Sequence, residues 1–206
     1  MSDLFALLRD EILSGRIPAG QRITEQKICE TYQVSRTPVR EAFFRLELLG
    51  LIELIPNRGA FVLGMSQQEI RDLYEMRKVC EILAVKWSIQ RMTEEELIQL
   101  TEACELMEFY TQKQDYEKML SGNRQFHELI SRASHNRMLE RTLSSFHAYV
   151  KQHKIQSQQE RDPDADLAVI LEEHKQILKA FQQRDQKAAV AAMSYHLDQS
   201  KKRAGL

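Results

Sequence analysis

Residues 35–49 read SRTPVREAFFRLELL, and their spacing predicts the helix around which the rest of the chain is organised. Ser35 can cap the first free N–H groups, and Pro38 fits the first turn, where a missing N–H is harmless. Apolar side chains then recur every three or four residues and form one stripe, which consists of Val39, Phe43, Leu46 and Leu49. Gly50 follows as a helix stop.

The polar side of this helix carries its positive charge close to the N-terminal end. Arg36, Thr37 and Arg40 lie off the apolar stripe. Planar guanidinium groups on the first turns of a helix suit guanine edges and phosphates in a DNA major groove. The pattern therefore predicts a helix that reads double-stranded DNA.

The flanking residues predict a winged helix-turn-helix. Thr24 opens a short helix over residues 25–32, and Gln33-Val34 links it tightly to the helix above. After Gly50, β-rich runs at 51–55 and 60–63 flank the turn Pro56-Asn57-Arg58-Gly59, which is typical of a hairpin. The alternative is a purely structural helix pair and hairpin whose arginines are merely solvated.

Residues 15–62 resemble the winged helix of the GntR family over their whole length, and VSRTPVREA at 34–42 is close to that family's most specific motif. The resemblance implies an operator DNA partner, bound as a homodimer on a short palindrome. Together with the exposed positions above, it gives the candidate DNA-binding residues Arg36, Thr37, Arg40, Arg45, Arg58, Gln26 and Gly59.

Composition limits the remaining classes. The chain has 206 residues, of which 43% are hydrophobic and 29% charged, and no apolar run approaches a membrane span. The N-terminus has early acids and no signal-peptide pattern, and three widely spaced cysteines fit a reducing cytoplasm. The net charge is −1, and residues 1–64 hold eight basic and eight acidic side chains. DNA binding must then depend on where the arginines are placed.

The pattern is helical from Ser66 onward. Ser66-x-x-Glu69 and Thr93-x-x-Glu96 are capping boxes, and further breaks predict six helices in all. The predicted fold is mostly α: a winged helix-turn-helix with a small β-hairpin wing over residues 1–64, then an all-α six-helix bundle over 65–206 that binds an effector and dimerises.

Several polar residues interrupt the apolar stripes of this bundle. His174 lies eleven residues before Asp185 and His196 eleven after it, so two antiparallel helices meeting at Asp185 would place both rings at one depth. Asn123 and His127, four apart, share a face of a third helix. Neutral imidazoles that converge in this way can bind a divalent transition metal such as Zn, Ni or Mn.

Two alternatives stay open for these histidines. They can be hydrogen-bonded core residues of a DNA-binding regulator, or ligands of a metal-dependent helical enzyme that activates water. No inward carboxylate beside the histidines offers itself as a general base in the sequence, which argues against an enzyme.

Residues 69–200 resemble the FCD effector domain of the FadR subfamily of GntR regulators, and six helices resemble its VanR-type branch. The resemblance implies a metal at Asn123, His127, His174 and His196, although Asn123 stands where the family usually has aspartate. It also implies that Arg77 faces a small carboxylate effector, with His147 a weaker candidate for lining the same cavity. An ion pair between Arg77 and Glu81 is the alternative for that arginine. The prediction is a bacterial, cytoplasmic, effector-responsive regulator of transcription.

Overall fold

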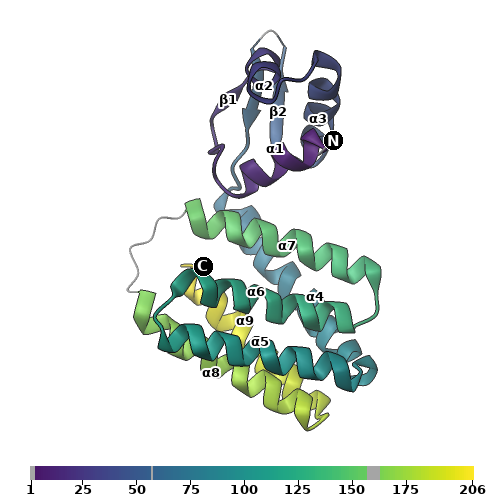
Figure 1. Cartoon of the computed structure of the whole chain (residues 1–206), viewed down its shortest axis with the longest axis vertical. Coiled ribbons are helices and arrows are strands. Elements are labelled where there is room, and N and C mark those ends of the chain that lie inside the picture. The colour runs from purple at the N-terminus through teal and green to yellow at the C-terminus, as the bar shows by residue number, and fades with distance from the viewer. Residues whose placement is uncertain (1–2, 57, 157–162) are drawn as a thin grey trace. The chain divides into compact units, whose positions relative to one another are not determined.

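The computed structural model describes residues 3–56, 58–156 and 163–206, so the predicted turn residue Asn57 lies outside the described residues. The chain divides into two compact units, residues 1–70 with 148–158 and residues 71–147 with 159–206. Helices dominate both units, and the described strands form one small sheet (Figure 1). The predicted fold class, a winged helix-turn-helix followed by a six-helix domain, is confirmed.

Up to residue 62, the first unit contains three helices and three short strands. In order these are α1 Leu4–Leu13, β1 Arg22–Ile23, α2 Glu25–Tyr32, α3 Arg36–Leu48, β2 Ile52–Ile55 and β3 Gly59–Val62. β2 and β3 form the predicted hairpin, with Ile52 opposite Val62 and Ile55 opposite Gly59. β1 pairs with the other edge of β3, giving the order β1-β3-β2. The sequence did not predict β1, since two residues are too few to show alternation.

α2 and α3 join through a left-handed residue. The hydroxyl of Thr24 accepts a hydrogen bond from the N–H of Lys27 and caps α2. Gln33 follows at φ 51°, which turns the chain sharply into α3. Ser35 stands at the predicted cap position of α3, but its side chain makes no cap hydrogen bond, so that part of the prediction is wrong.

α3 buries a narrower stripe than the sequence predicts. Val39, Ala42, Phe43 and Leu46 are buried, whereas Leu49 is 48% exposed. Leu49 is the C-cap residue, and Gly50 directly after it adopts φ +66° and ends the helix as predicted. Because the chain leaves the helix there, Leu49 no longer follows the helical period that would have buried it.

The second unit is built almost entirely of helices that pack on one another. The helices after β3 are α4 Gln67–Arg91, α5 Glu94–Gln112, α6 Tyr116–Ala133, α7 Arg137–Gln156, α8 Pro163–Gln182 and α9 Gln186–Arg203. The first residues of α4 and the part of α7 from residue 148 onward belong to the first unit. Both predicted capping boxes form, at Ser66 with Glu69 and at Thr93 with Glu96. α5 packs against α6 and α8, and α8 packs against α9 (Figure 1).

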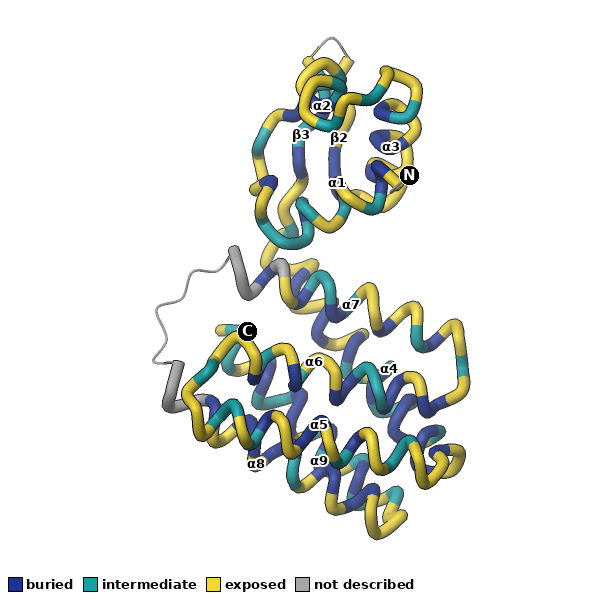
Figure 2. Tube along the Cα trace, in the orientation of Figure 1, coloured by how far each residue is buried: buried dark blue, intermediate teal, exposed yellow. Residues whose placement is uncertain are grey.

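The core of the second unit runs along the inward faces of these helices (Figure 2). Among its fully buried side chains are Phe126, Phe181, Leu100, Met107 and Met119. Gly122 lets α6 approach α5, because a Cβ at this position would lie 2.8 Å from Cγ of Met107. Several polar residues share this core, among them three histidines and two glutamates.

Neither the cysteines nor the hydropathy of the described helices restricts the fold further. Cys29, Cys80 and Cys104 are free; Cys104 is buried, and Cys29 and Cys80 are partly exposed. Among the described residues, no helix combines the length and apolar character needed to cross a bilayer.

Candidate metal centre and DNA-facing helix

Three imidazole rings meet inside the second unit. His127 comes from α6, His174 from α8 and His196 from α9, and each residue is at most 2% exposed. One nitrogen from each ring lies within 4.8 Å of the others. The ring centres of His174 and His196 are 4.4 Å apart, as expected for two helices that turn back at Asp185.

Hydrogen bonds fix the tautomer of each ring. Nδ1 of His174 lies 2.7 Å from the carbonyl oxygen of Ile170, which only accepts, so Nδ1 carries the proton. Nδ1 of His196 lies 2.7 Å from Oε2 of Glu173, and Nδ1 of His127 lies 3.0 Å from Oε2 of Glu81. Carboxylates also accept here, which leaves every Nε2 as a lone pair.

These lone pairs face one another and lack donors. Nε2 of His127 is 3.2 Å from Nε2 of His196. Nε2 of His174 is buried and has no hydrogen-bond partner among the described residues. Two lone pairs at that distance repel each other, and a cation between them removes the repulsion. Nitrogen ligands on one metal at about 2.1 Å stand roughly 3.0–3.4 Å apart, which matches the observed separation.

Burial keeps the rings neutral. Burial lowers the pKa of His127 and of His196 to about 4, despite the opposing effect of the neighbouring glutamates. Burial, followed by the nearby His196, lowers the pKa of His174 well below its usual value. Neutral imidazole is the form that binds a metal.

Asn123 fits a fourth position. It lies one turn before His127 on α6, and its Oδ1 is buried without a hydrogen-bond partner among the described residues. A buried amide oxygen without a donor is costly unless something else pairs with it. The three histidine nitrogens therefore fit a divalent metal, and the buried oxygen of Asn123 remains available as the predicted fourth ligand.

Two buried glutamates stand beside the histidines, and sequence reasoning missed this arrangement. Glu81 is fully buried and Glu173 is 6% exposed, so the prediction that no inward carboxylate lies beside the histidines is wrong. A signal was present, because Glu173 continues the stripe of Ile170 and Ile177 at spacings of three and four. Arg77 and Glu81 likewise lie four residues apart, which places them on one face of α4.

Both carboxylate oxygens of Glu81 already accept hydrogen bonds. Its Oε1 lies 3.1 Å from Nε of Arg77 and 2.8 Å from Nε2 of His147, and its Oε2 accepts from His127. Burial raises its pKa, but His127 and His147 outweigh this and hold it well below the usual value. Glu81, His127 and His147 are close enough to hold an ion, yet their mutual hydrogen bonds already satisfy this carboxylate.

Hydrogen-bond donors of this kind make both glutamates weak bases. Burial opposes the shift, but Arg203 and then His196 lower the pKa of Glu173 to about 2. A general base works best with a pKa near the working pH. The newly found carboxylates therefore add little support to the enzyme alternative.

The alternative for Arg77 is observed, because it forms the buried ion pair with Glu81. Its contact with an effector stays a prediction. His147 is buried on α7, and its Nδ1 has no hydrogen-bond partner among the described residues.

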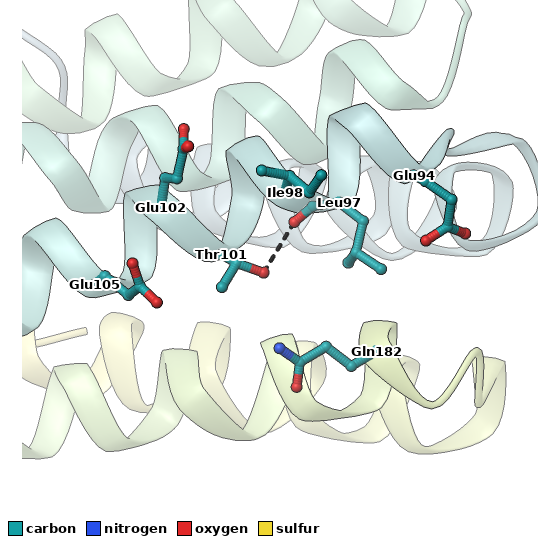
Figure 3. Close-up of a pocket in the computed structure, with 7 residues that line it drawn as sticks. All are labelled: Glu94, Leu97, Ile98, Thr101, Glu102, Glu105 and Gln182. Atoms are coloured by element: carbon teal, nitrogen blue, oxygen red, sulfur yellow. Dashed lines mark hydrogen bonds between the residues drawn. The ribbon is translucent and has the colours of Figure 1, made fainter.

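A separate surface depression of about 400 Å³ lies between α5 and α8. Figure 3 shows its lining residues, Glu94, Leu97, Ile98, Thr101, Glu102, Glu105 and Gln182. It is acidic and contains none of the histidines. Its charge suits neither DNA nor a carboxylate.

α3 presents its predicted polar residues to solvent in the first unit. Arg36, Thr37 and Arg40 are all exposed. Nε of Arg40 lies 2.8 Å from Oε1 of Glu25 on α2, an exposed pair that holds the guanidinium at the junction of the two helices. Their contacts with DNA stay predictions.

The other DNA-binding candidates differ in how firmly they are held. Arg45 forms an ion pair with Asp3 at 3.1 Å, and its guanidinium stacks 3.7 Å from the ring centre of Phe5. Gln26 donates to Glu30 at 2.9 Å. Arg58 is exposed beside the wing turn, and Gly59 begins β3.

Comparison with known proteins identifies the family. Residues 1–62 match the model of the bacterial regulatory proteins of the gntR family, and residues 72–199 match the FCD domain. The chain belongs to the GntR family. It is a transcriptional regulator with an FCD domain. The finer placement in the FadR subfamily and VanR branch stays a prediction.

Relatives and solved structures agree with this assignment. The Uxu operon transcriptional regulator of Escherichia coli (strain K12) is 30% identical over 96% of this chain and 84% of its own length. The transcriptional repressor RspR of Escherichia coli (strain K12) is 26% identical, covering 95% and 85%. E. coli McbR/YncC has the same fold, with a TM-score of 0.81, 21% identity and coverage of 98% and 94%.

Proposed function

We propose that this GntR regulator binds a palindromic operator as a homodimer in the bacterial cytoplasm, and that a small organic acid held near a metal ion controls it. The observation that carries the DNA-binding part is the exposure of Arg36, Thr37 and Arg40 at the start of α3, within the unit that matches the gntR model. The DNA-binding domain in this proposal spans residues 1–64, and the helical domain that binds the effector spans residues 65–206.

In this proposal, the recognition of DNA bases depends on a small number of charged side chains. The first 64 residues are neutral overall, so phosphate attraction must come from local groups on α3 and the wing. Arg36, Thr37 and Arg40 read bases or adjacent phosphates in this proposal. Gln26 and Arg45 help to fix the protein on the DNA backbone, Arg58 reaches the DNA from the wing, and Gly59 shapes the wing. A dimer doubles these contacts and explains the expected palindrome.

The metal is held by His127, His174 and His196, with Asn123 as fourth ligand. This ligand set contains no negative charge. Imidazole ligands suit zinc or nickel, whereas manganese prefers carboxylate oxygens, so Zn or Ni is favoured over Mn. When bound, the metal offers a Lewis-acidic position to an oxygen ligand. An anionic effector completes the neutral ligand set more favourably than water does.

The effector is a small carboxylate that also carries a hydroxyl group. With Nε2–H of His147 donating to Glu81, Nδ1 of the neutral ring is an acceptor, and it is buried without a partner among the described residues. A hydroxyl group satisfies it, and Arg77 supplies positive charge nearby. Relatives include repressors named for the gluconate and galactonate operons, and both compounds are hydroxy acids.

A gel-shift titration tests the DNA-binding part, with an operator selected by the wild-type chain from random duplex DNA. Arg40→Ala should weaken specific binding by roughly 1–3 kcal/mol, because it removes a guanidinium aimed at a base. Arg16→Ala is the matched control, since both arginine side chains are 65% exposed but Arg16 lies outside α2 and α3. Equal binding by the wild type and Arg40→Ala would refute the assignment of α3.

A further inference from the structure

Arg203, in the last turn of α9, is linked to the histidine cluster by the buried carboxylate of Glu173. Nη1 and Nη2 of Arg203 lie 2.8 and 2.7 Å from Oε1 and Oε2 of Glu173, a two-point ion pair. Oε2 of Glu173 also accepts the Nδ1–H of His196 at 2.7 Å. The Arg203 side chain is only 18% exposed. A continuous series of hydrogen bonds therefore runs from the end of α9 to Nδ1 of His196.

The opposite side of the cluster has a matching arrangement. There Arg77 contacts Glu81, and Glu81 accepts from Nδ1 of His127. Two of the three histidines are thus each held by a carboxylate that an arginine holds in turn. The two arginines differ in their place in the sequence. Arg77 lies within residues 72–199, which match the FCD domain, whereas Arg203 lies beyond them.

Geometry explains why the arginine matters. Glu173 is a buried carboxylate, and a buried charge persists only when it is paired. The two parallel hydrogen bonds from the planar guanidinium fix the carboxylate in one orientation. That orientation directs Oε2 at Nδ1 of His196, which leaves Nε2 bare and turned toward His127.

We propose that Glu173 and Arg203 are positioning residues, which set the tautomer and orientation of His196 and make metal affinity depend on the final turn of α9. This inference rests on the proposed metal site. Outer partners of metal-bound histidines commonly change metal affinity by roughly 10- to 100-fold when they are removed. The proposal assigns that effect to a residue near the C-terminal end of this chain.

The test compares Arg203→Met, Arg203→Lys and Glu173→Gln with the wild type, and uses Lys202→Met as control. Lys202 is the exposed neighbour of Arg203 on the same turn. Zinc affinity is measured by competition with a chromophoric chelator. The tautomer of His196 in the metal-free protein is read from nitrogen-15 NMR of the imidazole rings, and circular dichroism checks folding.

We expect Arg203→Met and Glu173→Gln to bind zinc roughly 10- to 100-fold more weakly, with a loss of the Nδ1–H tautomer of His196. Arg203→Lys should recover part of both properties, and Lys202→Met should match the wild type. A folded Arg203→Met protein with wild-type zinc affinity and an unchanged His196 tautomer would overturn the proposal. If that variant does not fold, Glu173→Gln carries the same test, and wild-type zinc affinity with an unchanged His196 tautomer in that variant is the contrary result.

The two proposals can fail separately. If the wild-type chain binds no zinc, the metal site is wrong, but the His196 tautomer in the metal-free variants still decides whether Arg203 and Glu173 position the ring. If the wild type binds zinc and the tautomer does not respond, only the inference about Arg203 and Glu173 fails.

Discussion

At the scale of single residues, the centre depends on which nitrogen of each ring carries the proton. Ile170, Glu81 and Glu173 each take a hydrogen bond from Nδ1 of one histidine. The three Nε2 lone pairs then converge in the core, where desolvation strengthens their mutual repulsion. A bound cation converts this costly arrangement into a favourable one.

The neutral histidines predict an acid-sensitive fold. In the unfolded chain they titrate near 6.5, whereas in the folded chain the pKa values of His127 and His196 are about 4. Between these values the unfolded state binds more protons, so the free energy of unfolding must fall as the pH drops from about 6.5 toward 4. Each histidine contributes roughly 1.4 kcal/mol per pH unit within that window.

Tryptophan fluorescence can follow this loss in metal-free protein, because the chain's single tryptophan, Trp87, lies on α4 in the unit that holds the histidines. Urea titrations at several pH values give the free energy of unfolding. A free energy of unfolding that stays constant from pH 7 to pH 5 would contradict the neutral, buried state of these rings.

Asn123 offers a second test at the same scale. Asn123→Asp places a negative oxygen where the buried Oδ1 now lacks a partner, so metal affinity should rise on the order of tenfold. The metal-free variant should be less stable, because its carboxylate is then buried without a counter-charge. Chelator competition measures the affinity, and a value no tighter than that of the wild type would exclude Asn123 as a ligand.

Sequence could identify the histidines but not their hydrogen-bond partners. The spacing about Asp185 places His174 and His196 at one depth, which follows from helical rise alone. Whether Glu173 turns inward depends on Arg203, thirty positions away on another helix, and local periodicity carries no information about such a pairing. Glu81 was recognised as a neighbour of Arg77, but its burial depends on His127 and His147, which lie far away in the sequence.

At the scale of elements, the pattern of caps and breaks predicts the helices better than the sheet. Six helices, α4 to α9, follow Ser66 as predicted, because capping boxes and left-handed residues act locally. His135, for example, ends α6 with φ 51°. The sequence did not predict β1, because this two-residue strand is defined by its pairing with β3 and not by a local pattern.

Gly59 begins β3 close to the backbone of β1, and its replacement should weaken the wing. It has φ +93°, and a Cβ there would lie 3.0 Å from the carbonyl oxygen of Ile23. Gly59→Ala should therefore cost roughly 1–3 kcal/mol of local stability. Hydrogen exchange of the β3 amides measures this cost.

Gly20→Ala is the control for Gly59→Ala. Gly20 has a similar φ of +80°, but a Cβ there meets nothing within 4 Å, so this variant isolates the backbone strain. If Gly20→Ala destabilised the sheet as much as Gly59→Ala, the contact with Ile23 would have no measurable role.

At the scale of the whole molecule, the chain combines a DNA-binding unit without net charge and a helical unit that we propose senses a ligand. A net charge of −1 gives little general attraction to DNA, so we propose that specificity depends on the exposed arginines of α3, Arg36 and Arg40. Control by an effector requires that the ligand bind two states of the regulator with different affinity. The metal centre supplies the position where we propose that such a ligand binds.

The most direct test of the metal centre is a zinc titration of the chelator-treated chain, followed by Trp87 fluorescence during thermal unfolding. We predict one bound metal per chain and a melting temperature that rises with zinc concentration, because the ion binds only the folded state. His174→Ala should abolish both effects, and His135→Ala, which removes an exposed histidine outside the cluster, should leave them intact. A wild-type chain that binds no zinc or nickel and melts identically with and without chelator would contradict the account.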